Sequence, residues 1–249
     1  AGEVGDGNRK DIREAVEAAR KAEGWSKATA HNRAQVIYYI AENLEARAPE
    51  FRDRLALMTG ESKRSAAKEV AASVNRLFTY GAWADKYDGR VHATPLRNVT
   101  IAMNEPVGVM AVVCPDENPL LGFVSLAFAP FAMGNRVVAI PSAAHPLAAT
   151  DLYQVLDTSD VPGGSLNIVT GDTATLANVL AQHDSVDAMW DFGSPDGGTA
   201  VERASIGNMK QTWVSRGQAR DWFDAEQGEG DEFLRKSTQV KNIWVPYGE

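Results

Sequence analysis

Residues 107–140 read VGVMAVVCPDENPLLGFVSLAFAPFAMGNRVVAI, in which two short apolar runs flank an acidic, Pro-containing turn and a long apolar stretch. The runs at 107–113 and 136–140 have the length and β-branched content of strands. The stretch that begins near Pro119 is long enough for a helix. A strand, a helix and a second strand in this order predict a βαβ unit whose parallel strands are buried on both faces.

The same alternation continues towards the C-terminus. Further strands are predicted at 165–170, 186–192 and 210–215, and helices are predicted to begin near Pro146, after Gly171 and near Pro195. Five such strands with intervening helices predict a Rossmann-like α/β domain over residues 105–217. Ligands of these sheets bind at the carboxyl ends of the strands, which is where the turn at 114–119 lies.

The flanking segments differ in character. Residues 1–89 predict a helical layer, with helices from Asn8 to Gly24, over 28–47, after Pro49 and over 62–87. Residues 90–104 contain β-branched residues and a Pro-containing break, and they predict a hairpin. Residues 218–237 are acidic, contain glycine and show no clear periodicity, which predicts a linker or surface loop. Residues 238–249 predict a terminal strand that Pro246 stops.

Composition excludes several classes of protein. A formal net charge of -8 argues against nucleic acid and anionic membranes as partners, and no apolar run is long enough for a membrane helix. With no signal peptide and one cysteine, we expect a soluble, cytoplasmic chain without disulfides or a Cys/His metal site. The four histidines lack metal-ligand spacing and are expected at the surface: His31, His92, His145 and His183. The first residue is not Met, so we expect a piece of a longer protein.

Several motifs together resemble the aldehyde dehydrogenase superfamily, in order and spacing, over almost the whole chain. They are AWADKYDG (82–89), NEPVGVMAVVCP (104–115), LAFAPFAMGNRVV (126–138), VPGGSLNIVTG (161–171), FGSPDGG (192–198), NMKQTWV (208–214) and TQVKNIWVP (238–246). Four further motifs are CPDENPLL (114–121), PSAAHPL (141–147), MWDFGS (189–194) and WVSRG (213–217). Together with the PYGE ending, they look closest to the second, C-terminal module of the double-length family 16 aldehyde dehydrogenases. The resemblance implies cofactor and oligomerisation domains, with the hairpin and the last strand forming a β-flap.

The resemblance also implies that the catalytic groups are missing. The Asn that stabilises the oxyanion in active members corresponds to Glu117, and a carboxylate cannot donate a hydrogen bond. Asn118 would substitute only in a shifted register. The general-base Glu corresponds to Ser215, and the acidic segment 218–237 stands where a catalytic domain should follow. Cys114, at the end of a buried strand, is expected to be inert. We therefore expect no catalytic residues.

The resemblance leaves cofactor binding open. Ile140 and Ala143 stand where active members hold the adenosine ribose with Lys and Glu. A vestigial site for NAD comprises Gly171, Gly193, Ser194 and Gly198, three of which lie at a helix N-terminus that can bind pyrophosphate. Asp196 would repel that phosphate, and the alternative is that Gly193 and Gly198 only permit tight packing. We expect no required cofactor, with NAD binding possible but weakened.

These observations predict a non-catalytic module that scaffolds dimerisation and docks on an NAD-dependent aldehyde dehydrogenase catalytic domain of the same parent polypeptide. The expected interface lies on the β-flap: Val99, Ile101, Val240, Ile243, Trp244 and Val245. One alternative is an NAD-binding regulatory module, and another is an NAD-dependent aldehyde oxidoreductase active only within the parent enzyme. The pair Asp116 and Glu117 also resembles an acid/base dyad, but a solvated turn is the favoured interpretation.

Overall fold

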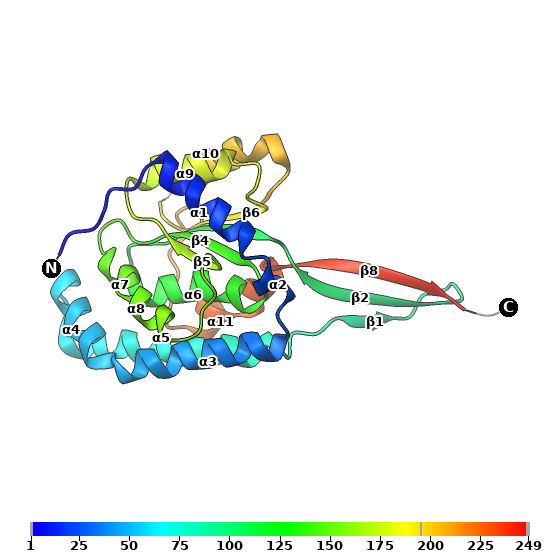
Figure 1. The fold of residues 1–249 in the computed structure, drawn as a ribbon, viewed down its shortest axis with the longest axis horizontal. Helices are drawn as coiled ribbons and strands as arrows, with labels where there is room; N and C mark the ends of the chain where they lie inside the picture. The colour runs from blue at the N-terminus through cyan, green and yellow to red at the C-terminus, as the bar shows by residue number, and fades with distance from the viewer. Residues whose placement is uncertain (1, 195, 248–249) are drawn as a thin grey trace.

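The computed structural model describes residues 2–194 and 196–247, which form a layered α/β body from which a β-flap extends (Figure 1). The body contains a five-stranded parallel sheet with strand order β5-β4-β3-β6-β7. The flap is a three-stranded antiparallel sheet with order β1-β2-β8. The predicted Rossmann-like fold with a helical layer and a flap is therefore confirmed.

All five predicted strands of the parallel sheet are present. They are β3 (Val109–Val113), β4 (Arg136–Ile140), β5 (Leu166–Ile168), β6 (Ala188–Asp191) and β7 (Gln211–Val214). Every residue of β3 is buried, as a central parallel strand covered on both faces requires. β3 pairs with β4 and β6, so the turn that follows β3 opens where the strand order reverses.

The N-terminal layer contains one helix more than predicted. It comprises α1 (Arg9–Lys21), α2 (Gly24–Lys27), α3 (Ala30–Ala46), α4 (Ala48–Thr59) and α5 (Lys63–Ala84). Asn8 caps α1 as expected, but Gly24 begins α2 instead of ending α1. The physical reason is Trp25, whose ring stacks on Phe131 with centroids 4.1 Å apart and whose Nε1 donates to the Phe131 carbonyl at 2.9 Å.

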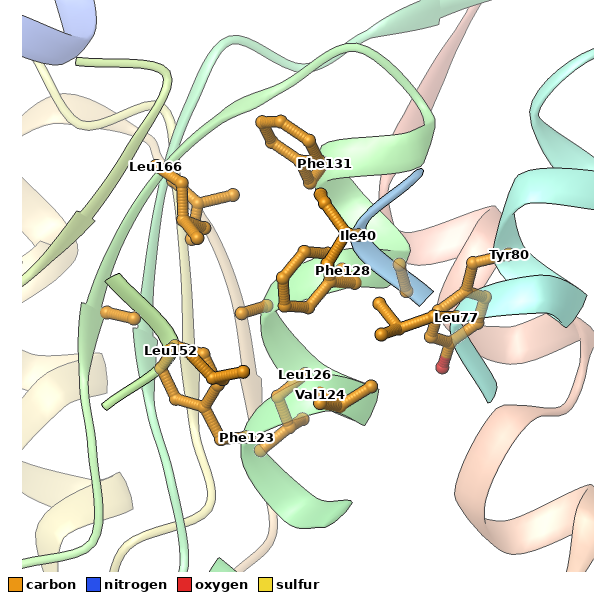
Figure 2. Packing of buried hydrophobic residues seen from close by; sticks show 14 of the residues in the cluster. Ile40, Leu77, Tyr80, Phe123, Val124, Leu126, Phe128, Phe131, Leu152 and Leu166 are labelled. Carbon is orange, nitrogen blue, oxygen red and sulfur yellow. The ribbon is translucent and has the colours of Figure 1, made fainter. Parts of the chain in front are cut away.

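Helix α6 (Pro119–Ala132) forms the centre of the larger core, and all of its residues are buried. Figure 2 shows its side chains Phe123, Val124, Leu126, Phe128 and Phe131 among Ile40 of α3, Leu77 and Tyr80 of α5, Leu152 and Leu166. This burial explains why the stretch from Pro119 is apolar all round and has no polar stripe.

The remaining helices cover both faces of the parallel sheet. They are α7 (Leu147–Thr150), α8 (Leu152–Asp157), α9 (Thr173–Gln182), α10 (Gly197–Ala204), the 3₁₀ helix η1 (Ser205–Asn208), α11 (Ala225–Glu229) and α12 (Asp231–Lys236). Helices α1, α9 and α10 pack on one face of the sheet and form a second core (Figure 1). One helix of the Rossmann-like domain was predicted to begin near Pro195, and this residue lies outside the described residues.

The prediction of a linker or surface loop at 218–237 is wrong. This segment contains α11 and α12, and Trp222, Phe233 and Leu234 are buried in the main core. The buried guanidinium of Arg76 on α5 also holds the segment, because it donates to the carbonyls of Trp222 and Gly228 and pairs with Glu229. In the sequence, its acidic residues make the segment resemble a loop, although a few apolar side chains pack it against the body.

The predicted hairpin and terminal strand form the flap. Strand β1 is Arg90–His92, β2 is Asn98–Pro106 and β8 is Thr238–Pro246. β2 and β8 pair along their full length, from Asn98 opposite Pro246 to Pro106 opposite Thr238. Figure 1 shows this ladder extending away from the body, with the last described residues at its far end.

Candidate functional site

The turn after β3 does not form an acid/base dyad. Asp116 accepts hydrogen bonds from the Ser142 hydroxyl at 2.6 Å and from the Ala144 amide at 3.1 Å, so it joins the turn to the loop after β4. Glu117 points to a different region, where it lines a cleft. Asn118 has a left-handed backbone, with φ of 48°, and begins α6 without a side-chain capping bond.

The two positions that the sequence resemblance assigns to the oxyanion donor and the general base lie at one cleft. Glu117 and Ser215 both line a cavity of about 140 Å³ at the carboxyl ends of β3, β6 and β7. Its other walls include Pro115, Phe192, Gly193, Ser194, Arg220 and Trp222. The fold therefore brings the predicted positions together, but their side chains are a carboxylate and a hydroxyl.

Cys114 is buried at the end of β3. Burial raises the pKa of its thiol, which disfavours the nucleophilic thiolate. The cysteine is also not among the residues that line the 140 Å³ cleft. The structure thus places it as an apolar core residue.

Two backbone amides at the N-terminus of α10 make internal hydrogen bonds. The Gly193 amide donates to Oδ1 of Asp191 at 2.9 Å, and the Gly197 amide donates to the Ser194 hydroxyl oxygen at 3.1 Å. Asp191 is 2% exposed, and burial raises the pKa of its carboxyl group. Both amides therefore have acceptors within the turn, and the buried Asp191 carboxyl group is one of them.

Two glycines of the expected NAD site are closely packed against strands of the sheet. A Cβ on Gly193 would lie 2.8 Å from Cγ1 of Val113, and a Cβ on Gly198 would lie 2.9 Å from Cβ of Val214. Non-bonded contacts this short are essentially never seen, so a side chain at Gly198 would push α10 from β7, and one at Gly193 would force Val113 or the turn to shift.

Gly171 lies elsewhere, beside the N-terminal segment. It lines a cavity of about 200 Å³ together with Ala143 and with residues 4–6. The segment is fixed there because the Gly7 amide donates to the Thr170 carbonyl at 2.7 Å and the Thr170 hydroxyl donates to the Gly5 carbonyl at 2.7 Å. Ile140, the other position of the ribose contact, is buried in β4.

Within 2–194 and 196–247, no group of three or more His, Cys, Asp or Glu side chains is arranged to hold a metal ion. No helix of this described part is long and apolar enough to cross a membrane. Among the histidines, His183 accepts a hydrogen bond from the Ser185 amide at Nδ1, and burial lowers its pKa.

The model of the aldehyde dehydrogenase family matches residues 1–220. The chain belongs to this family. It is 30% identical over 219 residues to betaine aldehyde dehydrogenase of Bacillus subtilis, a match that covers 86% of this chain and 44% of the relative. The chain therefore spans less than half the length of the curated relatives it matches.

Solved structures agree with the fold. A putative aldehyde dehydrogenase from Burkholderia cenocepacia superimposes with a TM-score of 0.82 at 27% identity, over 86% of this chain and 44% of that one. Betaine aldehyde dehydrogenase of Staphylococcus aureus in complex with NAD⁺ gives a TM-score of 0.81 at 24% identity, over 85% of this chain and 43% of that one. At that identity the second match establishes the fold alone.

Sequence reasoning missed four side chains that shape the site. Asp191 lies under the α10 turn, Glu69 caps α6, Arg76 fastens the segment 218–237, and Arg220 lies at the cleft. The stretch TWVSRGQARDWF (212–223) holds two arginines and three aromatic residues, but only Trp213 among them contacts Arg220, so it did not reveal the arrangement. Glu69 and Arg76 act through partners distant in sequence, and Asp191 acts through a local turn that hydrophobic periodicity does not reveal.

Proposed function

We propose that this chain is a non-catalytic aldehyde dehydrogenase module that scaffolds dimerisation. In this proposal it docks through its β-flap on the catalytic domain of an NAD-dependent aldehyde dehydrogenase within the same parent polypeptide. The observation that carries the proposal is the nine-residue ladder of β2 and β8, which holds apolar side chains outside the body.

The register of the ladder sorts the expected interface residues onto two faces. Directly opposed residues share a face, so Val99 pairs with Val245 and Ile101 with Ile243 on the first face. Val91 of β1, opposite Ile101, and Met103 extend this apolar face. Val240 and Trp244 lie on the second face, where Asn104 and Thr100 oppose them.

Exposure of these side chains supports a docking role. Val91 is 73% exposed, Val240 is 60% exposed and Trp244 is 55% exposed. β8 is also an edge strand of its sheet. An edge strand with exposed apolar residues is prone to pair with another chain, and strand addition is a common mode of recognition.

The cleft supports the non-catalytic part of the proposal. A carboxylate at position 117 would repel a developing oxyanion, and loss of an oxyanion donor costs about 3 kcal/mol of transition-state stabilisation. The hydroxyl of Ser215 is a far weaker base than a carboxylate. The proposal requires no cofactor. The Gly193 and Gly197 amides at the N-terminus of α10 already donate to side chains of the same turn, which favours the proposal over an NAD-sensing module.

The test uses Ile243→Asp and Trp244→Asp, singly and together, in the isolated chain and in the parent polypeptide. Charges on the two faces are expected to abolish dimerisation in sedimentation experiments and to reduce aldehyde-dependent NADH production by the parent. Asn178→Asp is the matched control, because it adds the same charge at an exposed polar position of α9, outside the flap. Unchanged assembly and unchanged activity of the double variant would refute the proposal.

A further inference from the structure

Three aromatic rings converge on the guanidinium of Arg220. Its Cζ lies 5.1 Å from the ring centroid of Trp213, 5.3 Å from that of Phe192 and 5.5 Å from that of Phe233. All three distances are within the range of cation–π attraction. The rings also support one another edge to face, with Trp213 4.9 Å from Phe192 and 5.2 Å from Phe233. We call these three rings the aromatic cage.

Polar groups complete the surroundings of this cation. Nη1 of Arg220 donates to the Gln227 carbonyl at 2.7 Å, and Nη2 lies 3.5 Å from Oε2 of Glu232. The side chain is only 21% exposed. The ion pair with Glu232 is long, so the rings and the carbonyl account for most of the recognition. Lys236 approaches Trp213 at 6.0 Å, which is a weaker contact with the same ring.

The cage adjoins open space on two sides. Arg220 lines the 140 Å³ cleft that contains Glu117, and it also lines a second cavity of about 400 Å³ whose walls include Glu226 and Glu232. Arg220 itself belongs to residues 215–224, which are in neither a helix nor a strand. Phe192 lines the cleft and Trp213 lines the second cavity, so removal of the Arg220 side chain would open these two rings to a cation from outside.

We propose that the aromatic cage is a binding site for a planar guanidinium cation, and that Arg220 is its internal occupant. The site is distinct from the flap and goes beyond the proposed scaffold function. Its chemistry favours guanidinium over a quaternary ammonium ion, because the Gln227 carbonyl and the Glu232 carboxylate require N–H donors. With Arg220 in place, the cage is closed to external cations.

The experiment removes the occupant and offers a replacement. Arg220→Ala is expected to lower the melting temperature by about 5 °C through loss of the desolvated cation–π contacts. Millimolar methylguanidinium should restore most of this loss, relative to sodium chloride at equal ionic strength, and should bind saturably in calorimetry. Tetramethylammonium should restore less, and the wild-type chain should show no saturable binding.

Two controls make the test specific. Arg216→Ala removes a neighbouring arginine that is 63% exposed and pairs only with Glu202 among the described contacts, so methylguanidinium should not change its melting temperature. Trp213→Leu in the Arg220→Ala background should abolish rescue. If Arg220→Ala does not fold, Arg220→Gln, which keeps a polar but shorter and uncharged side chain, is titrated instead. Absence of saturable methylguanidinium binding to the folded variant, or equal binding without Trp213, overturns the proposal.

Discussion

The carboxylate of Glu69 on α5 caps the N-terminus of α6 by accepting the Leu120 amide at 2.9 Å. The same oxygen accepts the Leu121 amide at 3.1 Å, and Glu69 is 4% exposed. Asn118 supplies no capping bond to a backbone amide, so a residue from another helix satisfies amides that begin the central helix. The helical layer thus stabilises the turn that carries Glu117.

Replacement of Glu69 by Leu should therefore destabilise the fold. Two buried amides would lose their acceptor, which is expected to lower the free energy of unfolding by about 3 kcal/mol. Glu69→Gln keeps an acceptor oxygen and should cost about 1 kcal/mol or less. Urea denaturation of both variants measures the difference. Equal losses for Leu and Gln would contradict the capping role.

Arg76→Leu should detach the segment that contains α11 and α12. The guanidinium is 4% exposed and donates to two carbonyls of this segment, besides its pair with Glu229 at 3.2 Å. Removal of one partner from a buried charged network is expected to lower the free energy of unfolding by about 3–5 kcal/mol. Limited proteolysis should then cleave within 218–237, whereas the wild type should resist. Arg52→Ala, which removes an exposed ion pair with Asp53, should leave proteolysis unchanged.

The parallel sheet was predictable from sequence because its strands are apolar runs bounded by glycine, proline and polar turns. Some helix starts were predictable because a local capping residue marks them, as Asn8 does for α1. The segment 218–237 was not predictable, because only Trp222, Phe233 and Leu234 anchor it and because Arg76 lies far away in sequence. Its local composition resembles a loop, while its tertiary contacts make it part of the body.

The candidate site was predictable in position but not in chemistry. The positions of Glu117 and Ser215 at one cleft follow from the order of the strands. Asp191 beneath the α10 turn does not, because the sequence does not reveal that its carboxylate turns back to the Gly193 amide. Likewise, nothing local indicates that Arg220 lies among rings from β7, from α12 and from the turn after β6.

Asp191→Asn should stabilise the protein at neutral pH. Burial raises the pKa of the Asp191 carboxyl group above 3.8, so the folded state binds its proton more tightly than the unfolded state does. The free energy of unfolding of the wild type therefore falls as the pH rises through the folded-state pKa. Asn keeps the acceptor for Gly193 and removes the buried charge, with an expected gain of about 1 kcal/mol at pH 7. The gain should vanish below about pH 4. The free energies of unfolding of both proteins are measured from pH 3 to 8. A difference between them that does not change with pH would contradict the role of the buried Asp191 charge.

The same substitution should improve anion binding at the α10 turn. Wild-type protein is expected to give no saturable heat with millimolar NAD⁺ in calorimetry, whereas Asp191→Asn should bind at least about tenfold more tightly, because a buried like charge is removed. Asp196→Asn is the matched control, since Asp196 is exposed and water screens its charge. Micromolar binding of NAD⁺ to the wild type would instead favour the NAD-sensing module.

Gly198→Ala should destabilise the protein whether or not any ligand is present. The new Cβ would lie 2.9 Å from Cβ of Val214, which forces α10 away from β7 and is expected to cost about 1–3 kcal/mol. Gly207→Ala is the matched control, because no atom outside its immediate surroundings lies within 4 Å of a Cβ built there. Thermal unfolding without and with NAD⁺ distinguishes a packing role from a cofactor role. A packing glycine gives the same loss in both conditions, whereas a loss that appears only with NAD⁺ would restore Gly198 to a binding site.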